Sequence, residues 1–463
     1  MYQIDFSKPV HVYFVGIGGI SMSGLAEILL SRGFSVSGSD RQESPVTRKL
    51  EELGVRIHYG QKEENITPDI DVAVFTAAIH PDNPEYRAVE RLSIPHLTRA
   101  QLLGQVMAAY PSSVAISGTH GKTTTTSMIS EMLLASDADP TLSVGGILKD
   151  IGGNVRVGKS GCFVAEACEY TNSFLSLYPK TGIILDIDAD HLDFFKDLDD
   201  IRRSFHIFAT QIQEDGALII NGDIDRLSEI TDGLKCRIIT YGTAGTCDYW
   251  PSDISYDRMA HPTYQLHSRN AADGTETVQT VSLHVPGIHN VYNSMAAIAA
   301  VDLLGVCREV SLPALAAFSG TDRRFEYKGE RNGFTIIDDY AHHPTEIRAT
   351  LTAAQKIPHG KVWCIFQPHT YSRTKSLMHE FAEALCLADE VVLADIYAAR
   401  ETDTLGISSA TLQKEIRDLG HSCHYFPSFT EIENFVLENC NKNDLLITMG
   451  AGNVETIAED LLS

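Results

Sequence analysis

The sequence predicts an α/β protein of three units, each built on its own sheet. Residues 10 to about 100 alternate strand and helix signals, which is the order of an open parallel sheet. An apolar run at 114–116 restarts this alternation, and a third series of apolar runs begins near 325. We therefore expect boundaries that give units 1–107, 108–320 and 321–463.

Hydrophobic patterning places the elements inside each unit. In the first unit we expect strands at 10–15, 34–36 and 72–75, and helices through Leu25, Ile28 and Leu29 and at 46–53. In the second we expect strands at 162–165, 183–185 and 218–220, antiparallel strands between about 236 and 285, and a helix at 292–304. In the third we expect strands at 335–337, 362–366, 391–394 and 445–449.

Composition and charge narrow the class of protein. The 463 residues carry a formal net charge of -24, which repels phosphate backbones and argues against nucleic acid as a partner. The nine cysteines are scattered without a C-x-x-C pair, which favours reduced thiols in the cytoplasm. No basic region followed by a long apolar run opens the chain, and no apolar stretch has membrane-spanning length, so we expect neither a signal peptide nor a membrane partner.

One stretch carries a phosphate-binding motif. Residues 118–128 read GTHGKTTTTSM, between an apolar run and a helical pattern. Its glycines let backbone N–H groups face an anion, and the helix N-terminus adds partial positive charge. Lys122 can reach the β- and γ-phosphates, and the Thr123 hydroxyl can hold Mg²⁺. Ile116 stands where the general pattern has its first glycine, so the loop is a shorter variant. We predict ATP binding by Gly118, Thr119, His120, Gly121, Lys122, Thr123 and Thr124.

A second glycine-rich loop, VGIGGISMSG, follows the first expected strand. It fits the dinucleotide fingerprint G-x-G-x-x-G in part, because Ser21 stands at the place of the third glycine. Asp40 follows the next strand, where an acidic residue often meets a ribose. The loop recognises phosphate and not the base, so NAD and a UDP-type ligand both satisfy it. Tight packing of the helix on the strand would also explain its glycines.

Acidic residues follow two further expected strands. Glu166 ends an apolar run, and Glu169 comes three residues later. A second group follows the next run: Asp188, Asp190, His191 and Asp193. Open α/β sheets place their ligands at such strand ends, and Mg²⁺ prefers carboxylate, hydroxyl and phosphate oxygens. We expect Glu166 and Thr123 to hold the first ion, whereas a lone histidine such as His191 is more often a hydrogen-bonding residue.

Eight motifs occur in one order along the chain: VGIGGISMSGLAEIL, GTHGKTTTT, EACEYTNSF, DADHLDFF, PGIHNVYNSMAA, GTDRRFE, DDYAHHPTE and QPHTYSRT. Together they resemble the Mur ligase family, from about residue 10 to GAGN at 450–453. The phosphate loop is shared across that family. The N-terminal loop and DDYAHHPTE point to the member that acts on UDP-N-acetylmuramate and L-alanine, in peptidoglycan precursor synthesis.

The resemblance implies a three-domain Mur ligase architecture. A Rossmann-like N-terminal domain would bind the UDP of the substrate, a central P-loop ATPase-like domain ATP, and a Rossmann-like C-terminal domain would close over both. It favours a UDP-sugar over NAD as the ligand of the first glycine loop. The substrate-binding candidates are then Gly16, Gly18, Gly19, Ser21, Ser23, Asp40, His369 and Arg373.

The resemblance also implies ATP and Mg²⁺ as cofactors, with His191 near a second ion. It adds four residues to the ATP site: Asn290, Asn293, Arg324 and Asp339. The catalytic candidates are Lys122, His191 and His343. Several related ligases carry a carbamylated lysine that bridges metals, but His206 aligns with that position, so such a lysine is not supported.

The implied activity is ligation of an amine to a carboxylate through an acyl phosphate. The base that takes the amine proton stays open among His343, His191 and water. One alternative is a sister ligase that adds a tripeptide or another amino acid. A nicotinamide-dependent dehydrogenase would leave the ATP loop unexplained. A non-catalytic nucleotide-binding regulator would not need Lys122, Thr123, Glu166 and His191 together.

Overall fold

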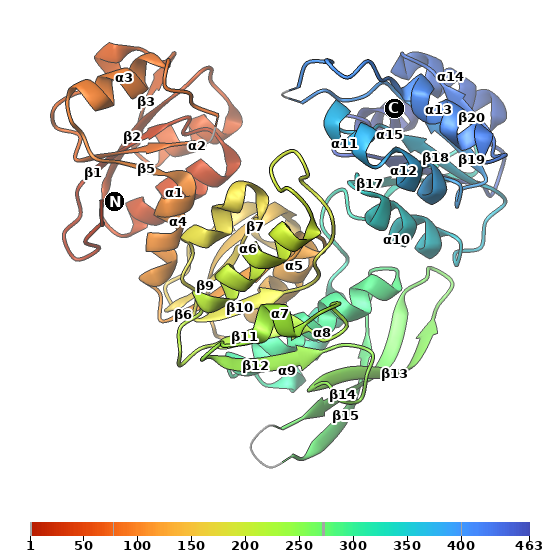
Figure 1. The fold of residues 1–463 in the computed structure, drawn as a ribbon, viewed down its shortest axis with the longest axis horizontal. Coiled ribbons are helices and arrows are strands. Elements are labelled where there is room, and N and C mark those ends of the chain that lie inside the picture. The colour runs from red at the N-terminus through yellow and green to blue at the C-terminus, as the bar shows by residue number, and fades with distance from the viewer. Residues whose placement is uncertain (1, 77, 271–273, 400) are drawn as a thin grey trace.

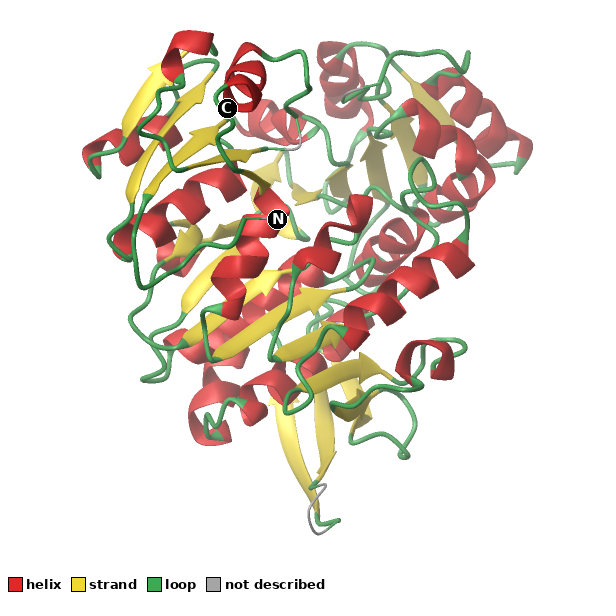
Figure 2. Cartoon of the chain, turned by 60° about the vertical axis from the view of Figure 1, so that its left-hand side comes forward, coloured by secondary structure: helices red, strands yellow, loops and turns green. Residues whose placement is uncertain are grey.

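The computed structural model describes residues 2–76, 78–270, 274–399 and 401–463. Three sheets form the centres of three bodies, which we call the N-terminal, middle and C-terminal domains. Figure 1 shows the N-terminal and C-terminal domains on either side, with the middle domain between and below them. Helices pack around each sheet (Figure 2), which confirms the predicted α/β architecture of three sheets.

The N-terminal domain has a five-stranded parallel sheet of order β3-β2-β1-β4-β5. Its elements are β1 (His11–Val15), α1 (Ile20–Ser31), β2 (Ser35–Asp40), α2 (Pro45–Glu52), β3 (Arg56–Tyr59), η1 (Glu63–Asn65), β4 (Val72–Phe75), α3 (Pro84–Arg91), β5 (His96–Thr98) and α4 (Arg99–Ala108). The buried strands β1, β2 and β4 and helices α1 and α2 lie where patterning predicts them. The short edge strands β3 and β5 lack a long apolar run and escape that prediction.

Local capping explains where several of these helices begin. Ser44 and Thr47 form a capping box before α2, and Pro45 occupies the first helical position. Thr98 and Gln101 form a second capping box before α4. These side chains satisfy backbone N–H groups that have no acceptor inside the helix.

The middle domain has a ten-stranded sheet of order β15-β14-β13-β12-β11-β10-β6-β9-β7-β8. Its strands are β6 (Ser112–Ser117), β7 (Thr141–Leu148), β8 (Gly153–Arg156), β9 (Cys162–Glu166), β10 (Thr181–Ile184), β11 (Ala217–Asn221), β12 (Arg237–Tyr241), β13 (Tyr249–Tyr256), β14 (Pro262–Arg269) and β15 (Glu276–Ser282). Its helices are α5 (Lys122–Leu134), η2 (Lys149–Ile151), η3 (Tyr170–Ser176), α6 (Leu198–Thr210), α7 (Ser228–Thr231), α8 (Ile288–Leu303) and α9 (Arg308–Ala317).

One strand of this sheet corrects an expectation. Antiparallel pairing begins at β13, which pairs with β14, and β14 pairs with β15. β12 instead runs parallel to β11, so the expectation of antiparallel strands from about residue 236 is wrong for this strand. The physical reason is the helix α7 between β11 and β12, which returns the chain to the same end of the sheet.

The C-terminal domain has a six-stranded sheet of order β16-β17-β21-β18-β19-β20, in which β16 is antiparallel and the others are parallel. Its strands are β16 (Glu326–Arg331), β17 (Phe334–Asp339), β18 (Val362–Phe366), β19 (Glu390–Leu393), β20 (Cys423–Tyr425) and β21 (Leu445–Met449). Its helices are α10 (Pro344–Ala354), α11 (Tyr371–Ser376), α12 (Met378–Leu385), α13 (Ser409–Asp418), α14 (Phe429–Asn439) and α15 (Glu455–Leu462). Buried residues of α10, α12 and α13 join one apolar cluster with the sheet, and those of α14 and α15 join another.

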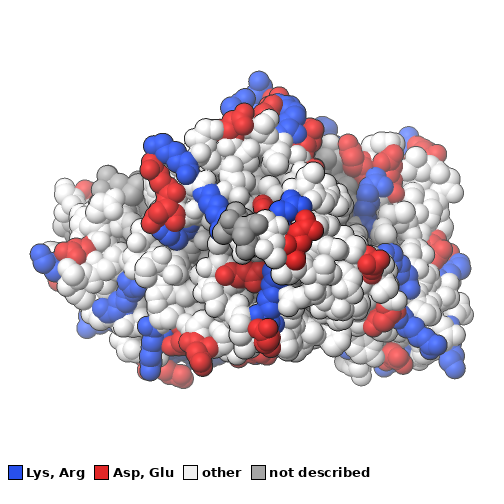
Figure 3. Space-filling model, turned by 90° about the horizontal axis from the view of Figure 1, so that it is seen from below, with Lys and Arg blue, Asp and Glu red and all other residues white. Residues whose placement is uncertain are grey.

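The charge and apolarity of the surface say little about which partners the protein could bind. On the face shown in Figure 3, basic and acidic side chains are interspersed, so the net charge of -24 is not gathered there into one acidic patch. Within the described ranges, no helix combines the length and apolarity that a membrane span needs.

Candidate active site

The loop after β6 has the backbone that a phosphate-binding turn needs. Gly118 has a φ of 137° and Gly121, which precedes α5, a φ of 82°, conformations that glycine adopts without the penalty of a side chain. A Cβ on Gly121 would lie 2.5 Å from the Asn293 Oδ1 atom. The Thr119 hydroxyl accepts a hydrogen bond from the Asp188 N–H at 2.9 Å, which ties the loop to the segment after β10.

Lys122 points back into this loop. Its Nζ donates to the carbonyls of Gly118 at 2.5 Å and Thr119 at 3.0 Å, and it lies 2.9 Å from a carboxylate oxygen of Glu169. Burial opposes the lysine charge, but the carboxylate of Glu169 outweighs it and raises the pKa of Lys122 above the ordinary lysine value. The side chain of Glu169 is 3% exposed. The loop therefore carries a buried cation whose counter-charge comes from the strand β9 side of the sheet.

Glu166 and Thr123 lie together beside the loop, as the sequence suggests for a metal site. The Gly145 N–H donates to the Glu166 Oε1 atom at 2.6 Å, and a Cβ on Gly145 would lie 2.5 Å from that carboxylate. Burial raises the pKa of Glu166, whereas the Gly145 N–H, Lys122 and the hydrogen bond from Thr123 lower it. A partly buried carboxylate and a hydroxyl at the start of α5 fit a hard cation such as Mg²⁺. Glycine at 145 leaves the space that this pair requires.

A cavity of roughly 240 Å³ adjoins the loop. Six of the predicted ATP-site residues besides His120 line it: Gly121, Thr124, Asn290, Asn293, Arg324 and Asp339. The Asn293 amide donates to the Asn290 Oδ1 atom at 3.0 Å, and Asn290 donates to the Pro286 carbonyl at 2.8 Å. Burial raises the pKa of Asp339 to about 6, although Arg324 and two backbone N–H groups oppose this.

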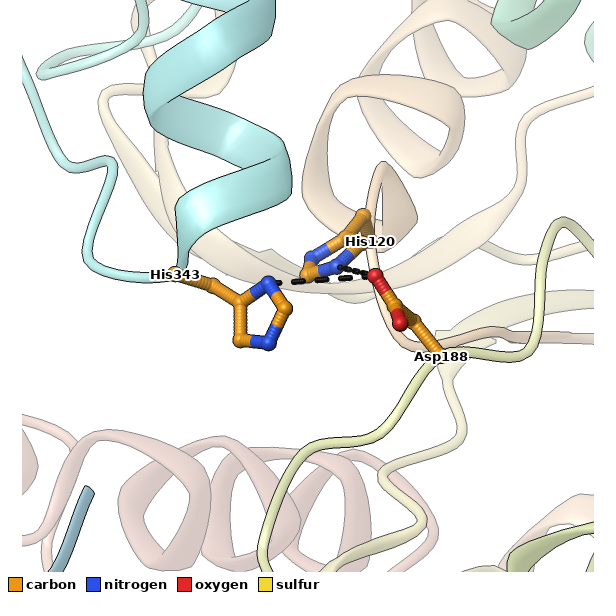
Figure 4. A group of neighbouring side chains, drawn as sticks. All are labelled: His120, Asp188 and His343. Atoms are coloured by element: carbon orange, nitrogen blue, oxygen red, sulfur yellow. Dashed lines mark hydrogen bonds and ion pairs between the residues drawn. The ribbon is translucent and has the colours of Figure 1, made fainter. Parts of the chain in front are cut away.

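His120 joins the middle and C-terminal domains. Its Nε2 atom lies 3.4 Å from an Asp188 carboxylate oxygen and its Nδ1 atom 3.4 Å from the Glu346 Oε1 atom. His343 approaches from the start of α10, with its Nδ1 atom 3.8 Å from the same Asp188 oxygen. Figure 4 shows both rings directed toward this carboxylate oxygen, with dashed lines from each ring to it. Thr345 also donates to Asp188, at 2.5 Å.

The raised pKa of His120 favours an ion-pair network around it. Burial disfavours charge on His120, but Asp186, Asp188 and Glu346 raise its pKa well above the ordinary histidine value. The hydrogen bond from His120 helps hold the pKa of Asp188 below its usual range. His343 Nδ1 accepts the Thr345 N–H at 3.3 Å. A protonated His120 can donate to both Asp188 and Glu346, and these contacts clamp the middle and C-terminal domains together.

A second cavity, of roughly 680 Å³, lies where the three domains meet. His191, His369 and Arg373, three of the predicted site residues, line it together with Asp190. Arg373 Nε donates to the Asp190 carboxylate at 3.0 Å, and its Nη1 atom lies 3.2 Å from the His369 Nδ1 atom. Burial lowers the pKa of His369 to about 4.

His191 stands between the loop and this second cavity. It has a φ of 55°, a strained value for a residue other than glycine and one that often accompanies a functional site. Its Nε2 atom lies 3.7 Å from both Glu169 and Asp190. Burial lowers the pKa of His191, although both carboxylates oppose that effect.

The first glycine loop is organised by Asp40. The Gly18 N–H donates to the Asp40 Oδ2 atom at 2.8 Å, and the N–H groups of Gly16 and Ile17 donate to the Ser39 carbonyl. Gly19 precedes α1 without a side-chain cap. Ser21 accepts a hydrogen bond from Arg99. The buried Ser23 hydroxyl donates to the Ile20 carbonyl, so it is occupied within the helix.

The family models and the relatives that match this chain all point to the same family. The Mur ligase family catalytic domain matches residues 11–111, the Mur ligase middle domain 116–301, and the Mur ligase glutamate ligase domain 323–452. A UDP-N-acetylmuramate–L-alanine ligase of Agathobacter rectalis is 58% identical over 462 residues, covering 100% of both chains. The chain belongs to the Mur ligase family.

Two solved structures of Mur ligases carry the same fold. A UDP-N-acetylmuramate-alanine ligase of Thermotoga maritima superposes with a TM-score of 0.77 at 29% identity, over 98% of each chain. A murein peptide ligase of Psychrobacter arcticus superposes with a TM-score of 0.69 at 25% identity, also over 98% of each chain.

Several residues around the sites of this Mur ligase have no place in the sequence prediction. Asp186, Tyr241 and His289 line the smaller cavity, and Arg99 lines the larger one. They come from separate elements, so no spacing rule links them. His206, at the position of the lysine of related ligases, lies on α6 with its Nδ1 atom 3.0 Å from the Ile230 carbonyl.

Proposed function

We propose that this Mur ligase uses ATP to join L-alanine to the lactyl carboxylate of UDP-N-acetylmuramate. The UDP-N-acetylmuramate–L-alanine ligase of Agathobacter rectalis matches the whole chain. The structural observation that carries the proposal is a series of side-chain contacts that links Lys122 of the phosphate loop to His191 at the larger cavity. Lys122 lies 2.9 Å from Glu169, and Glu169 lies 3.7 Å from His191, which lines that cavity.

A phosphate loop beside a second cavity suits transfer of a phosphoryl group to a carboxylate. A carboxylate is a poor electrophile because amide formation would expel an oxide. Transfer of the ATP γ-phosphoryl group gives an acyl phosphate, and attack by the alanine amine then expels inorganic phosphate. Lys122 and the loop N–H groups would stabilise the charge on the transferring group. Closure through His120, Asp188 and His343 would keep water from the acyl phosphate.

Mg²⁺ would be held by Glu166 and Thr123, with His191 near a second ion, and it would supply neutralising charge on the ATP phosphates. For the amine proton, His191 and His343 both have a pKa below the ordinary value because they are buried. Neutral imidazoles can accept a proton. The acceptor stays among these two histidines and water. The nine cysteines are all free thiols, which is consistent with a cytoplasmic site of action.

The test is ADP release with UDP-N-acetylmuramate, ATP and Mg²⁺, with and without L-alanine. We expect alanine-dependent release, and a turnover about 10²–10³-fold lower in Lys122→Ala because a donor to the transferring phosphoryl group is lost. Lys235→Ala, which removes an exposed lysine paired with Glu214, is the matched control and should keep full turnover. Release with a tripeptide but not with alanine would make the enzyme a murein peptide ligase. No release with either acceptor would contradict the ligase proposal.

A further inference from the structure

Tyr170 packs against the face of the His191 ring. The two ring centroids are 4.4 Å apart, and the ring planes are inclined at 30°. The Tyr170 hydroxyl donates to an Asp193 carboxylate oxygen at 2.9 Å. Both rings line the larger cavity, Tyr170 as the first residue of η3 and His191 from the segment after β10. One side chain therefore contacts the segment that carries His191 at two points.

The imidazole of His191 forms no hydrogen bond with any residue that the structure describes. Its Nε2 atom lies 3.7 Å from both Glu169 and Asp190, which is longer than a hydrogen bond, and the hydrogen bonds of this residue are made by its backbone. His342, for comparison, has its Nδ1 atom 3.0 Å from a backbone carbonyl. A functional histidine is ordinarily oriented by a hydrogen bond on one ring nitrogen. At His191 the contact with Tyr170 takes that place.

The backbone is strained on both sides of this ring contact. Thr171 (φ 54°, ψ 25°) and Asn172 (φ 57°, ψ 28°) directly follow Tyr170 and are both left-handed, and His191 has a φ of 55°. Side chains with a Cβ disfavour this conformation, and a β-branched residue such as threonine disfavours it most. Such strain persists only where the surroundings enforce it, and it gathers at functional sites. The fold therefore holds Tyr170 and His191 against each other although both turns are unfavourable.

We propose that Tyr170 is a positioning residue that holds the His191 imidazole with its Nε2 atom directed between Glu169 and Asp190. This assignment rests on the proposed function, in which His191 lies near the second ion or accepts the amine proton. Either role needs one fixed direction of the ring nitrogen, since a small misplacement of a reacting or ligating group lowers the rate strongly. Tyr170 acts through His191 and takes no part in bond making.

The first test observes the ring contact without turnover. An aromatic ring over an imidazole shifts the imidazole C–H resonances, which NMR of histidine-labelled protein records, and the spectrum of His191→Ala assigns them. We expect these resonances to move in Tyr170→Leu and to stay near their wild-type positions in Tyr170→Phe, which keeps an aromatic ring. Tyr178 lies in the same segment and is 53% exposed, so Tyr178→Leu is the matched control and should leave them unchanged. Unmoved resonances in Tyr170→Leu would overturn the proposal.

The second test separates positioning from a purely structural role. We expect ADP release to be about 10- to 100-fold slower in Tyr170→Leu, as for loss of a group that orients a functional histidine, with an unchanged KM for ATP. Tyr170→Phe should stay within a few-fold of wild type. In a His191→Ala background, Tyr170→Leu should slow the reaction no further, because the ring through which it acts is already gone.

Two kinetic outcomes would contradict this assignment: equal losses in Tyr170→Phe and Tyr170→Leu, or additive losses in the double variant. Absence of ADP release from the wild type with either acceptor would instead remove the proposed function. The NMR comparison would still decide whether Tyr170 orients His191, so the two failures are distinguishable.

Discussion

The two glycine loops of this Mur ligase differ in where the cation beside each loop comes from. Each follows a buried parallel strand and opens a helix, α1 in the N-terminal domain and α5 in the middle domain. The loop before α5 contains its own cation, Lys122, which Glu169 neutralises. The loop before α1 contains no lysine or arginine, and its nearest guanidinium comes from Arg99 on α4. One loop is complete within a short segment, and the other is assembled from distant parts of the chain.

The difference bears on what each loop can bind. The loop before α5 holds Lys122 against the buried Glu169 carboxylate, so the γ-phosphate of a bound ATP would have to compete with Glu169 for this lysine. The loop before α1 has Asp40 on the Gly18 N–H, and Arg99 beside it forms no ion pair with any Asp or Glu that the structure describes. We infer that the first loop is preorganised for an anion and that the second must rearrange its ion pair when ATP binds.

Matched glycine substitutions test whether the two loops bind their ligands independently of each other. In Gly121→Ala, the new Cβ would lie 2.5 Å from the Asn293 amide oxygen at a φ of 82°. In Gly18→Ala, it would lie 2.9 Å from both Asp40 and Thr47. Strain of about 1–3 kcal/mol corresponds to roughly 5- to 150-fold weaker binding. We expect Gly121→Ala to weaken ATP and Gly18→Ala to weaken UDP-N-acetylglucosamine, each measured by titration calorimetry.

The cross-titrations are the controls for this pair. Gly121→Ala should bind the sugar nucleotide like wild type, and Gly18→Ala should bind ATP like wild type. Gly54→Ala serves as a third variant, because Gly54 has a positive φ of 91° and a Cβ there meets nothing within 4 Å. Equal loss of both ligands in either loop variant would show that the two sites are not independent.

The same comparison shows what sequence reasoning reaches. Lys122, Thr123 and Glu166 are predictable because a short motif and an adjacent strand end carry them. Arg99 is not, since only the packing of α4 brings it to Ser21. Likewise β1 and β4 follow from buried apolar runs, whereas the edge strands β3 and β5 are short and partly exposed. Periodicity reports burial along one element, and contacts between elements depend on how the sheets pack.

The residues that the C-terminal domain contributes to the site show the same limit of prediction from sequence. The motif DDYAHHPTE marks His343 as functional, but the partners Asp188 and His120 lie in the middle domain. Glu346, the last residue of this motif, contacts His120, and the motif alone assigns it no role. These pairs depend on how two domains approach each other, which the pattern within one segment does not encode.

A close contact joins the N-terminal and middle domains. Gly24 of α1 packs against β8, where a Cβ would overlap the Val155 side chain. β8 pairs with β7, which carries Gly145 beside Glu166. We expect Gly24→Ala to lower the free energy of unfolding by about 1–3 kcal/mol through overpacking. Chemical denaturation would measure the change, and Gly24→Ala combined with Val155→Ala should recover part of it. Additive losses in the double variant would contradict the contact.

The clamp around His120 should make closure of the middle and C-terminal domains depend on pH. The pKa of His120 is raised in the folded protein, so its stabilising contribution is complete below the unfolded pKa of about 6.5. The contribution declines as the pH rises through the raised, folded pKa. Asp188 and Glu346 have lowered pKa values, so both stay ionised above pH 6.5 and add no slope there.

We therefore expect the free energy of unfolding of wild type to fall with pH above about 6.5, with a slope of at most about 1.4 kcal/mol per pH unit for one proton. His120→Gln should remove that slope and show a lower stability at neutral pH. Denaturation series at several pH values would measure both effects. His379 is exposed and pairs with Glu415, so His379→Gln should leave the slope nearly unchanged, as expected for a surface pair. If His120→Gln keeps the wild-type slope, the ring is not protonated in the closed protein, and the three side chains would be free to bind a metal ion instead.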